Sequence, residues 1–146
     1  KEGALILKGE ENLLQHIITE VKDGKLVIKV EKGINLSPSS WKQGIFVTIP
    51  VESVNAVTLS GSGDIVGKKT IDTENFKTDI SGSGDISLLV TANSVTATIS
   101  GSGEITLNGK TTDFEVRVSG SGDITYRGNP KKIDTKSSGS GDINKD

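Results

Sequence analysis

Acidic side chains recur at a regular spacing and are the residues in this chain best suited to chemistry. Each follows a Ser-Gly-Ser-Gly segment and precedes an isoleucine. The hexapeptide starts at residues 60, 81, 100, 119 and 138, so its copies lie 21, 19, 19 and 19 residues apart. The five acidic residues, called the acidic ladder below, are Asp64, Asp85, Glu104, Asp123 and Asp142. Carboxylates stacked about 5 Å apart near water repel one another by roughly 1 kcal/mol per pair, and a bound cation would relieve that repulsion.

Two interpretations of the acidic ladder are open. Ca²⁺ takes oxygen ligands, and glycine- and aspartate-rich β-rolls bind it, which makes the ladder a candidate metal site. Those rolls, however, repeat about every nine residues, and Glu104 is one methylene longer than its neighbours. We favour the second interpretation, in which each carboxylate caps its own turn by accepting hydrogen bonds from nearby backbone amides.

We do not expect the serines of the repeats to act as catalytic nucleophiles. Ser60, Ser81 and their equivalents would need an adjacent base to become nucleophiles. The only histidine, His16, lies in an alternating, strand-like segment. The Gly-x-Gly motifs also lack the following helix that phosphate binding requires. We therefore predict no catalytic or cofactor-binding residues, no cofactor other than calcium, and a protein that is not an enzyme.

Aromatic side chains are few, five in the whole chain. Trp41 follows a Ser/Pro loop and has no periodic partner, so we consider it a candidate ligand contact, for instance with a sugar, and otherwise part of the packing of a cap. Tyr126 occupies the same repeat position as Leu88 and Leu107. We expect its ring in the core and its hydroxyl at the rim.

The composition excludes several classes of protein. The chain has 146 residues, a size that suits one domain, and no cysteine, which excludes disulfides and thiolate metal sites. A net charge of −2 provides no general field for nucleic acid. No apolar run exceeds five residues, which is too short for a transmembrane segment.

The elements that must position these residues are strands. Apolar residues alternate with period 2 in each repeat, as in Ile86 and Leu88 or Ile105 and Leu107, which is typical of strands with one buried face. A strong turn recurs only once per repeat, whereas a hairpin meander needs one about every 8–12 residues. Stacked coils about 4.8 Å apart fit the pattern better. We predict an all-β fold, a right-handed parallel β-helix or solenoid with coils of about 19 residues.

Glycine has a defined place in this prediction. Each coil must bend after its Val/Ile strand, and glycine supplies a positive φ and lacks the Cβ that would meet the adjacent coil.

Residues 1–59 lack the repeat. The alternation on both sides of Asp23-Gly24 predicts a hairpin, and residues 45–49 are predicted to form a further extended run. We expect residues 1–146 to form a single solenoid domain, with 1–59 providing N-terminal strands and a cap and 60–146 the five repeats.

The Ser-Gly-Ser-Gly-Asp-Ile repeats, with Glu-Asn-Leu-Leu at residues 11–14 and Val-Lys-Asp-Gly-Lys-Leu-Val-Ile at 21–28, resemble a bacterial family. It is the auto-transporter adhesin head domain, or head GIN domain, of Bacteroidota. The resemblance covers nearly the whole chain. It implies a right-handed β-helix-like fold and an exported location, whether periplasmic, lipid-anchored or on the cell surface, with any signal segment outside this chain. It transfers no catalytic or binding residues.

We therefore expect a non-enzymatic, exported β-solenoid that serves in adhesion or ligand interaction, with a cell-surface glycan or a protein as its partner. Stacking of solenoids end to end offers a route to oligomers. One alternative is a β-helix enzyme acting on polysaccharides, although the segments between the predicted strands are short for a catalytic cleft. The other is a calcium-binding module built on the acidic ladder.

Overall fold

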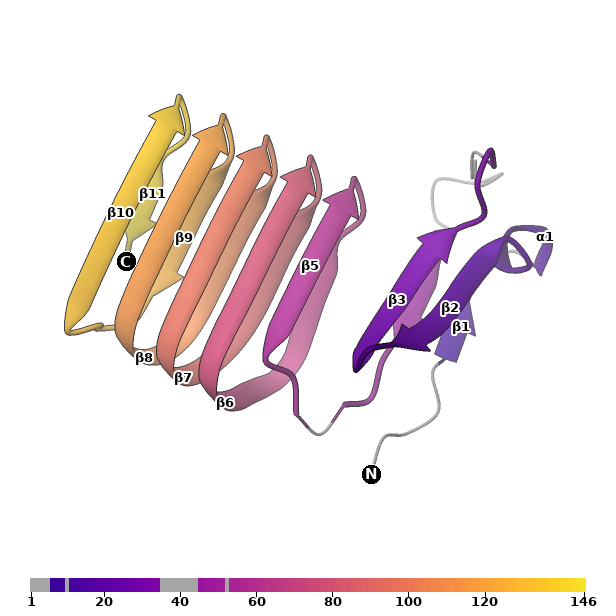
Figure 1. The fold of residues 1–146 in the computed structure, drawn as a ribbon, viewed down its shortest axis with the longest axis horizontal. Helices are drawn as coiled ribbons and strands as arrows, with labels where there is room; N and C mark the ends of the chain where they lie inside the picture. Colours follow the sequence, from indigo (N-terminus) through magenta and orange to yellow (C-terminus); the bar gives the residue numbers. More distant parts are fainter. Residues whose placement is uncertain (1–5, 10, 35–44, 52) are drawn as a thin grey trace. The chain divides into compact units, whose positions relative to one another are not determined.

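The chain forms two compact units, residues 1–52 and 53–146. The structure, a computed structural model, describes residues 6–9, 11–34, 45–51 and 53–146. Both units consist of strands, with one short helix in the first (Figure 1). In the described part of the chain, no helix combines the length and apolarity needed to cross a membrane.

The first unit holds two antiparallel strand pairs, β1 with β4 and β2 with β3. Its elements are β1 (Ile6–Lys8), α1 (Glu11–Leu14), β2 (Ile17–Lys22), β3 (Lys25–Val30) and β4 (Phe46–Thr48). At the β2–β3 turn Asp23 has φ 52° and Gly24 φ 73°, the left-handed conformations of a two-residue type I′ hairpin. The predicted hairpin and the extended run near residue 47 are confirmed.

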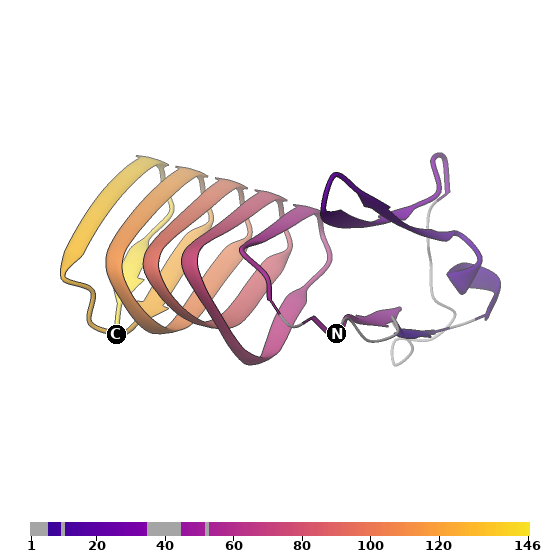
Figure 2. The same cartoon turned by 60° about the horizontal axis from the view of Figure 1, so that its bottom comes forward.

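The second unit is a β-solenoid. Its strands are β5 (Ala56–Gly61), β6 (Ile65–Gly82), β7 (Asp85–Gly101), β8 (Glu104–Gly120), β9 (Asp123–Arg127), β10 (Lys132–Gly139) and β11 (Ile143–Lys145). They pair in parallel in the order β5-β6-β7-β8-β9-β11, and β10 pairs with β8. Each of the long strands β6, β7 and β8 bends around a whole coil, so the coils stack as successive turns of a solenoid (Figure 2). The predicted all-β solenoid with coils of about 19 residues is confirmed.

Equivalent residues of successive coils lie directly over one another. Ile86 is in register with Ile105, and Ile105 with Ile124. The column continues to Ile65 at one end and Ile143 at the other. The three central isoleucines are at most 1 % exposed, so they form one apolar column inside the coils. Further inward columns, such as Phe76, Val95 and Phe114, complete the core.

Glycine is required at the corners for two different reasons. Gly101, the first glycine of its repeat, has φ 140°, a conformation that side chains rarely adopt. Gly103, the second, has no such φ, but a Cβ there would lie 2.2 Å from the carbonyl oxygen of Gly84 on the preceding coil. At Gly63, the equivalent glycine of the first coil, the nearest atom would be 4.0 Å away. The second glycine thus permits close stacking, as the sequence predicted, and does so only where a coil lies beneath it.

The polar segments within the coils differ from one another. Residues 108–113 remain within strand β8, where all but Thr112 are in register with residues of β7. Gly109, at φ 143°, permits the bend there. In the last complete coil, the turn predicted from Gly128 and Pro130 is present, since β9 ends at Arg127 and β10 begins at Lys132.

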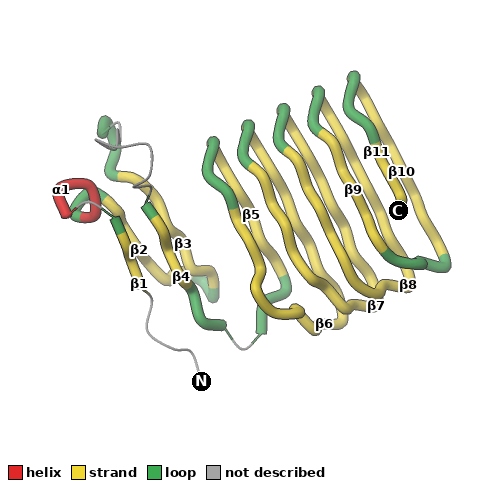
Figure 3. Tube along the Cα trace, turned by 180° about the vertical axis from the view of Figure 1, so that it is seen from behind, coloured by secondary structure: helices red, strands yellow, loops and turns green. Residues whose placement is uncertain are grey.

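The C-terminal coil is more exposed than the central ones. Every residue of β10 is exposed, and Figure 3 shows β10 and β11 at the end of the stack. Ser137 stands in register with Val118, in the column that other coils fill with Ile or Leu. Its hydroxyl donates to the carbonyl of Gly141 at 3.3 Å. Polar groups therefore cover this end of the solenoid.

Candidate functional site

The acidic ladder lies along an exposed line of the solenoid, next to the glycine corners. Asp85 Oδ1 accepts a hydrogen bond from the backbone N–H of Glu104 at 3.0 Å. Asp64 Oδ1 accepts one from the N–H of Asp85 at 3.3 Å, and Asp123 Oδ1 one from the N–H of Asp142 at 2.8 Å. Each of these carboxylates therefore caps the following coil and not, as the sequence suggested, its own turn. Parallel stacking brings the next acidic residue's N–H within reach of a short side chain.

Glu104 interrupts this pattern. Its carboxylate accepts a hydrogen bond from the Thr106 hydroxyl at 3.1 Å, on its own coil. The N–H of Asp123 instead donates to the carbonyl of Gly103 at 3.2 Å. The extra methylene carries the Glu104 carboxylate past the position from which an aspartate caps the next coil. The ladder is therefore two runs of capping carboxylates separated by a gap.

Calcium binding by the ladder stays a prediction. Among the described residues, no group of three or more His, Asp or Glu side chains is arranged to hold a metal ion. Three of the aspartates already use one carboxylate oxygen for the backbone of a neighbouring coil. The geometry supports a structural role for these carboxylates.

The other residues singled out by the sequence have surroundings of their own. His16 Nδ1 is 2.9 Å from Glu31 Oε2, and the Glu31 N–H donates to the His16 carbonyl at 2.8 Å, which places this pair in the first unit. The serines that open the repeats, from Ser60 to Ser138, are exposed along the solenoid. Trp41 lies outside the described residues.

Tyr126 belongs to the core, as predicted. It is 3 % exposed, and its ring lies 4.4 Å from that of Phe114, centroid to centroid. Its hydroxyl donates to the carbonyl of Gly109 at 3.2 Å. Burial raises the pKa of the Tyr126 phenol, and a hydrogen bond from the Thr111 backbone opposes this rise. All aromatic rings of the solenoid (Phe76, Phe114 and Tyr126) are thus buried.

The structure shows a surface hollow that the sequence interpretation missed. It lies where β6, β7 and β8 bend at the corner remote from the Ser-Gly-Ser-Gly segments, and its volume is about 530 Å³. Its principal polar groups are Asp72, Glu74, Thr91, Asn93, Lys110 and Thr112. Ala92, which stands in register between Thr73 and Thr111, is buried at the base of the hollow and packs into the core of the solenoid.

A sequence signal for this hollow existed in the charge pattern. Residues 86–103 contain no charged side chain, whereas the coils on both sides are charged. In register, Asp72 pairs with Thr91 and Thr91 with Lys110, so the sign of the charge reverses across the neutral coil. The signal becomes visible only when residues are aligned by coil, because these positions lie 19 residues apart in the chain.

The charged groups of the hollow have no ion-pair partner among the described residues, in contrast to those on the adjoining outer face. There, Lys77 Nζ lies 3.4 Å from Asp79 Oδ2, and Arg117 pairs with Glu115. Asp72, Glu74 and Lys110 make no such pair. The hollow therefore presents two free carboxylates on one side and a free ammonium on the other.

Comparison with known proteins agrees with this fold. The chain is similar to a protein described as a "putative adhesin" from Bacteroides fragilis NCTC 9343, with 22 % identity, 97 % of this chain and 82 % of that chain covered, and a TM-score of 0.55. It is also similar to a protein with the same description from Parabacteroides distasonis ATCC 8503, with 16 % identity, 97 % and 83 % covered, and a TM-score of 0.47. No curated protein matches the chain. Residues 1–145 match the family described as "Putative auto-transporter adhesin, head GIN domain", and the chain therefore belongs to that family.

Proposed function

We propose that the chain is a non-enzymatic, exported module that binds a ligand at the cell envelope or surface, as in adhesion. The observation that carries this proposal is the in-register stack of coils, whose inward columns are apolar and whose outward positions are polar. The core fixes the backbone, and the outward side chains of each coil then lie at a constant distance from those of the next. Membership of a family whose description reads "Putative auto-transporter adhesin, head GIN domain" supports the same function.

Presentation of repeated groups is the mechanism. Outward positions on successive coils lie about 4.8 Å apart, so an extended partner meets several of them at once. Each exposed contact contributes little by itself, but linked contacts add through a high effective concentration. The rigid core keeps the loss of conformational entropy on binding small.

The export of this module is part of the proposal. It is supported by the words "auto-transporter adhesin" in the family description, because auto-transporters are exported proteins. Fractionation of cells that produce the natural protein, with detection of this chain by antibody, would locate it. Recovery in the cytoplasm alone would contradict export, and recovery in the envelope or medium would agree with it.

The binding proposal is tested with the purified chain and isolated cell envelopes. We expect saturable binding that excess unlabelled chain displaces. A variant with Gly103→Asp, designed to disrupt coil stacking, serves as the control for the need for a folded solenoid. Retained binding by this unfolded control, or no saturable binding by the intact chain, would contradict the proposal.

The enzyme alternative has its own test. Sustained turnover on a panel of polysaccharides, abolished by replacement of a single carboxylate of the acidic ladder or of the hollow, would overturn the non-enzymatic assignment. We expect no turnover from the intact chain.

A further inference from the structure

We infer that the hollow at the β6–β8 corner binds an extended polar peptide that carries a basic group and an acidic group about 10 Å apart. The inference rests on the proposed binding function and assigns it a site and a ligand class. The basic group would face Asp72 and Glu74, and the acidic group would face Lys110. The peptide would lie across the coils, along the solenoid axis.

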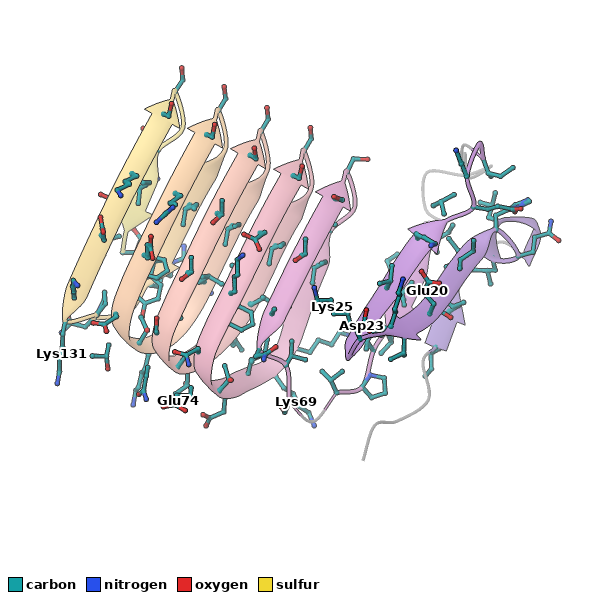
Figure 4. All side chains as sticks on the ribbon, in the orientation of Figure 1. Glu20, Asp23, Lys25, Lys69, Glu74 and Lys131 are labelled. Atoms are coloured by element: carbon teal, nitrogen blue, oxygen red, sulfur yellow. The ribbon has the colours of Figure 1, made fainter. Side chains whose placement is uncertain are left out.

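The register of the coils sets this charge separation. Asp72 of β6 is in register with Thr91 of β7, which is in register with Lys110 of β8. Two inter-strand steps separate the carboxylate side from the lysine side, which gives about 10 Å between their backbones. Figure 4 shows the Glu74 side chain projecting outward from the coil edge, where a ligand can reach it.

The charges of the hollow are available to a ligand. On the adjoining face, the same coils pair their charges internally, through Lys77 with Asp79 and Arg117 with Glu115. The hollow separates its charges by a neutral coil, so within the described structure they do not satisfy one another. A ligand with the opposite arrangement of charges would supply both partners at once.

The floor of the hollow is held in place by hydrogen bonds. Thr111 is 8 % exposed, and its hydroxyl oxygen lies 3.2 Å from the carbonyl oxygen of Asn93 and 3.0 Å from that of Asp113. This hydroxyl ties β8 to β7 at the corner. The site therefore does not need to be ordered by the ligand, which reduces the entropic cost of binding.

The charged groups of the hollow and its lack of aromatic side chains favour a peptide over a neutral glycan. Thr91, Asn93 and Thr112 offer hydroxyl and amide groups that both donate and accept, which suits the N–H and C=O groups of a peptide backbone. No aromatic ring of residues 53–146 is exposed to stack on a sugar. Asp72 pairs with Thr91 and Thr91 with Lys110 through the backbone, so recognition between these coils would come through side chains and not through addition of a strand.

The test is a titration of the whole chain with short fluorescent peptides, followed by anisotropy. The probe carries a lysine and a glutamate three residues apart, about 10 Å when extended, in a serine and asparagine background. Peptides with two lysines, two glutamates or no charge serve as ligand controls. We expect weak, saturable binding of the mixed-charge peptide, tighter than that of the three controls and weakened by added salt.

Variants of the hollow locate the binding. We expect Asp72→Asn with Glu74→Gln, and separately Lys110→Gln, to weaken binding by about fivefold or more, the scale of one or two lost surface ion pairs. The matched control is Asp134→Asn with Lys136→Gln on β10, which changes exposed charges away from the hollow and should leave the affinity unchanged. Absence of saturable binding, or equal weakening by the control pair, would overturn the inference.

The same variants separate this inference from the proposed function. If the chain binds cell envelopes and the hollow variants bind them equally well, the peptide site is wrong while the binding function stands. If the chain binds the mixed-charge peptide through the hollow but does not bind envelopes, the envelope function fails and the site stands. Displacement of the peptide by a neutral oligosaccharide would contradict the assigned ligand class.

Discussion

Single residues determine how closely the coils can approach. A Cβ on Gly103 would lie 2.2 Å from the Gly84 carbonyl oxygen and 2.9 Å from Ile80 Cγ2, and backbone atoms cannot yield as a flexible side chain can. Overpacking of this kind destabilises proteins by about 1–3 kcal/mol, occasionally more. The glycine ladder is therefore a requirement imposed by neighbouring coils and not by local conformation alone.

The corresponding prediction compares Gly103→Ala with Gly63→Ala. We expect Gly103→Ala to lower the free energy of unfolding by about 3 kcal/mol or more and Gly63→Ala to change it by less than about 0.5 kcal/mol. Neither glycine has a positive φ, and only Gly103 has a coil beneath it. Urea unfolding followed by circular dichroism measures both. Equal effects would show that these glycines act through the unfolded chain and not through stacking.

Thr78 is a polar residue within an apolar column. It is fully buried, and its hydroxyl has no hydrogen-bond partner. Its neighbours in register are Val57 and Ala97. Replacement with the isosteric valine removes an unsatisfied polar group, and we expect Thr78→Val to stabilise the protein by about 1 kcal/mol. A lower melting temperature than that of the unmodified chain would contradict this expectation.

The capping role of the acidic ladder can be separated from its charge. Asp85→Asn keeps the oxygen that accepts the Glu104 N–H, while Asp85→Ala removes it. We expect the alanine variant to be less stable than the asparagine variant by about 1 kcal/mol. Asp142 caps no following coil in the described structure, so its Ala and Asn variants should not differ. If both positions behave alike in urea unfolding, the inter-coil cap contributes nothing measurable.

At the scale of elements, strand β9 brings an ionisable group into the core through Tyr126. Burial raises the pKa of its phenol above the ordinary 10.0. The folded state therefore holds this proton at a pH where the unfolded chain has lost it. Since the native state then binds more protons, this contribution is fully present below pH 10 and declines as pH rises through the folded pKa.

We accordingly expect the stability difference between the unmodified chain and Tyr126→Phe to depend on pH. Below pH 9 the variant should lose about 1 kcal/mol with the hydrogen bond to the Gly109 carbonyl. Above pH 10 the difference should shrink or reverse, because phenylalanine has no proton to lose. Urea unfolding between about pH 8 and pH 11 measures the difference, in which the titration of the lysines cancels. A constant difference would mean that the phenol is not desolvated.

The sequence was sufficient to predict the elements that repeat. Period-2 alternation and the 19-residue spacing placed Ile86 and Ile105 in one column, because identical environments select identical residue types. The strand pairing of residues 108–113 could not be read from the sequence, since a polar composition does not reveal that a neighbouring coil pairs with their backbone. The hollow was missed, because its residues come from three coils and are brought together only when the chain is aligned by coil.

For the whole molecule, stability is distributed as in other repeat proteins, with each coil contacting only its neighbours. The central coils β7 and β8 hold most buried residues, and the outer strand β10 is exposed throughout. The hydrophobic core cluster lies wholly within residues 76–126, in the second unit. In the first unit, Leu13 is the one buried hydrophobic residue among those described, while Val21 is 75 % exposed. The two units therefore differ greatly in the apolar surface that each buries.

This difference predicts that a fragment of residues 53–146 folds on its own, whereas residues 1–52 alone do not. Burial of apolar area is the dominant favourable term in folding, and among the described residues an extended core is found in the second unit alone. We expect the fragment to keep its strand circular dichroism and a cooperative urea transition, and the isolated first unit to give collapsed amide dispersion in proton–nitrogen spectra. The difference in unfolding free energy between the whole chain and the fragment measures the capping that we predicted for the N-terminal residues. An unfolded fragment would show that the solenoid depends on residues 1–52. Equal unfolding free energies for the whole chain and the fragment would show that residues 1–52 do not stabilise the solenoid as a cap.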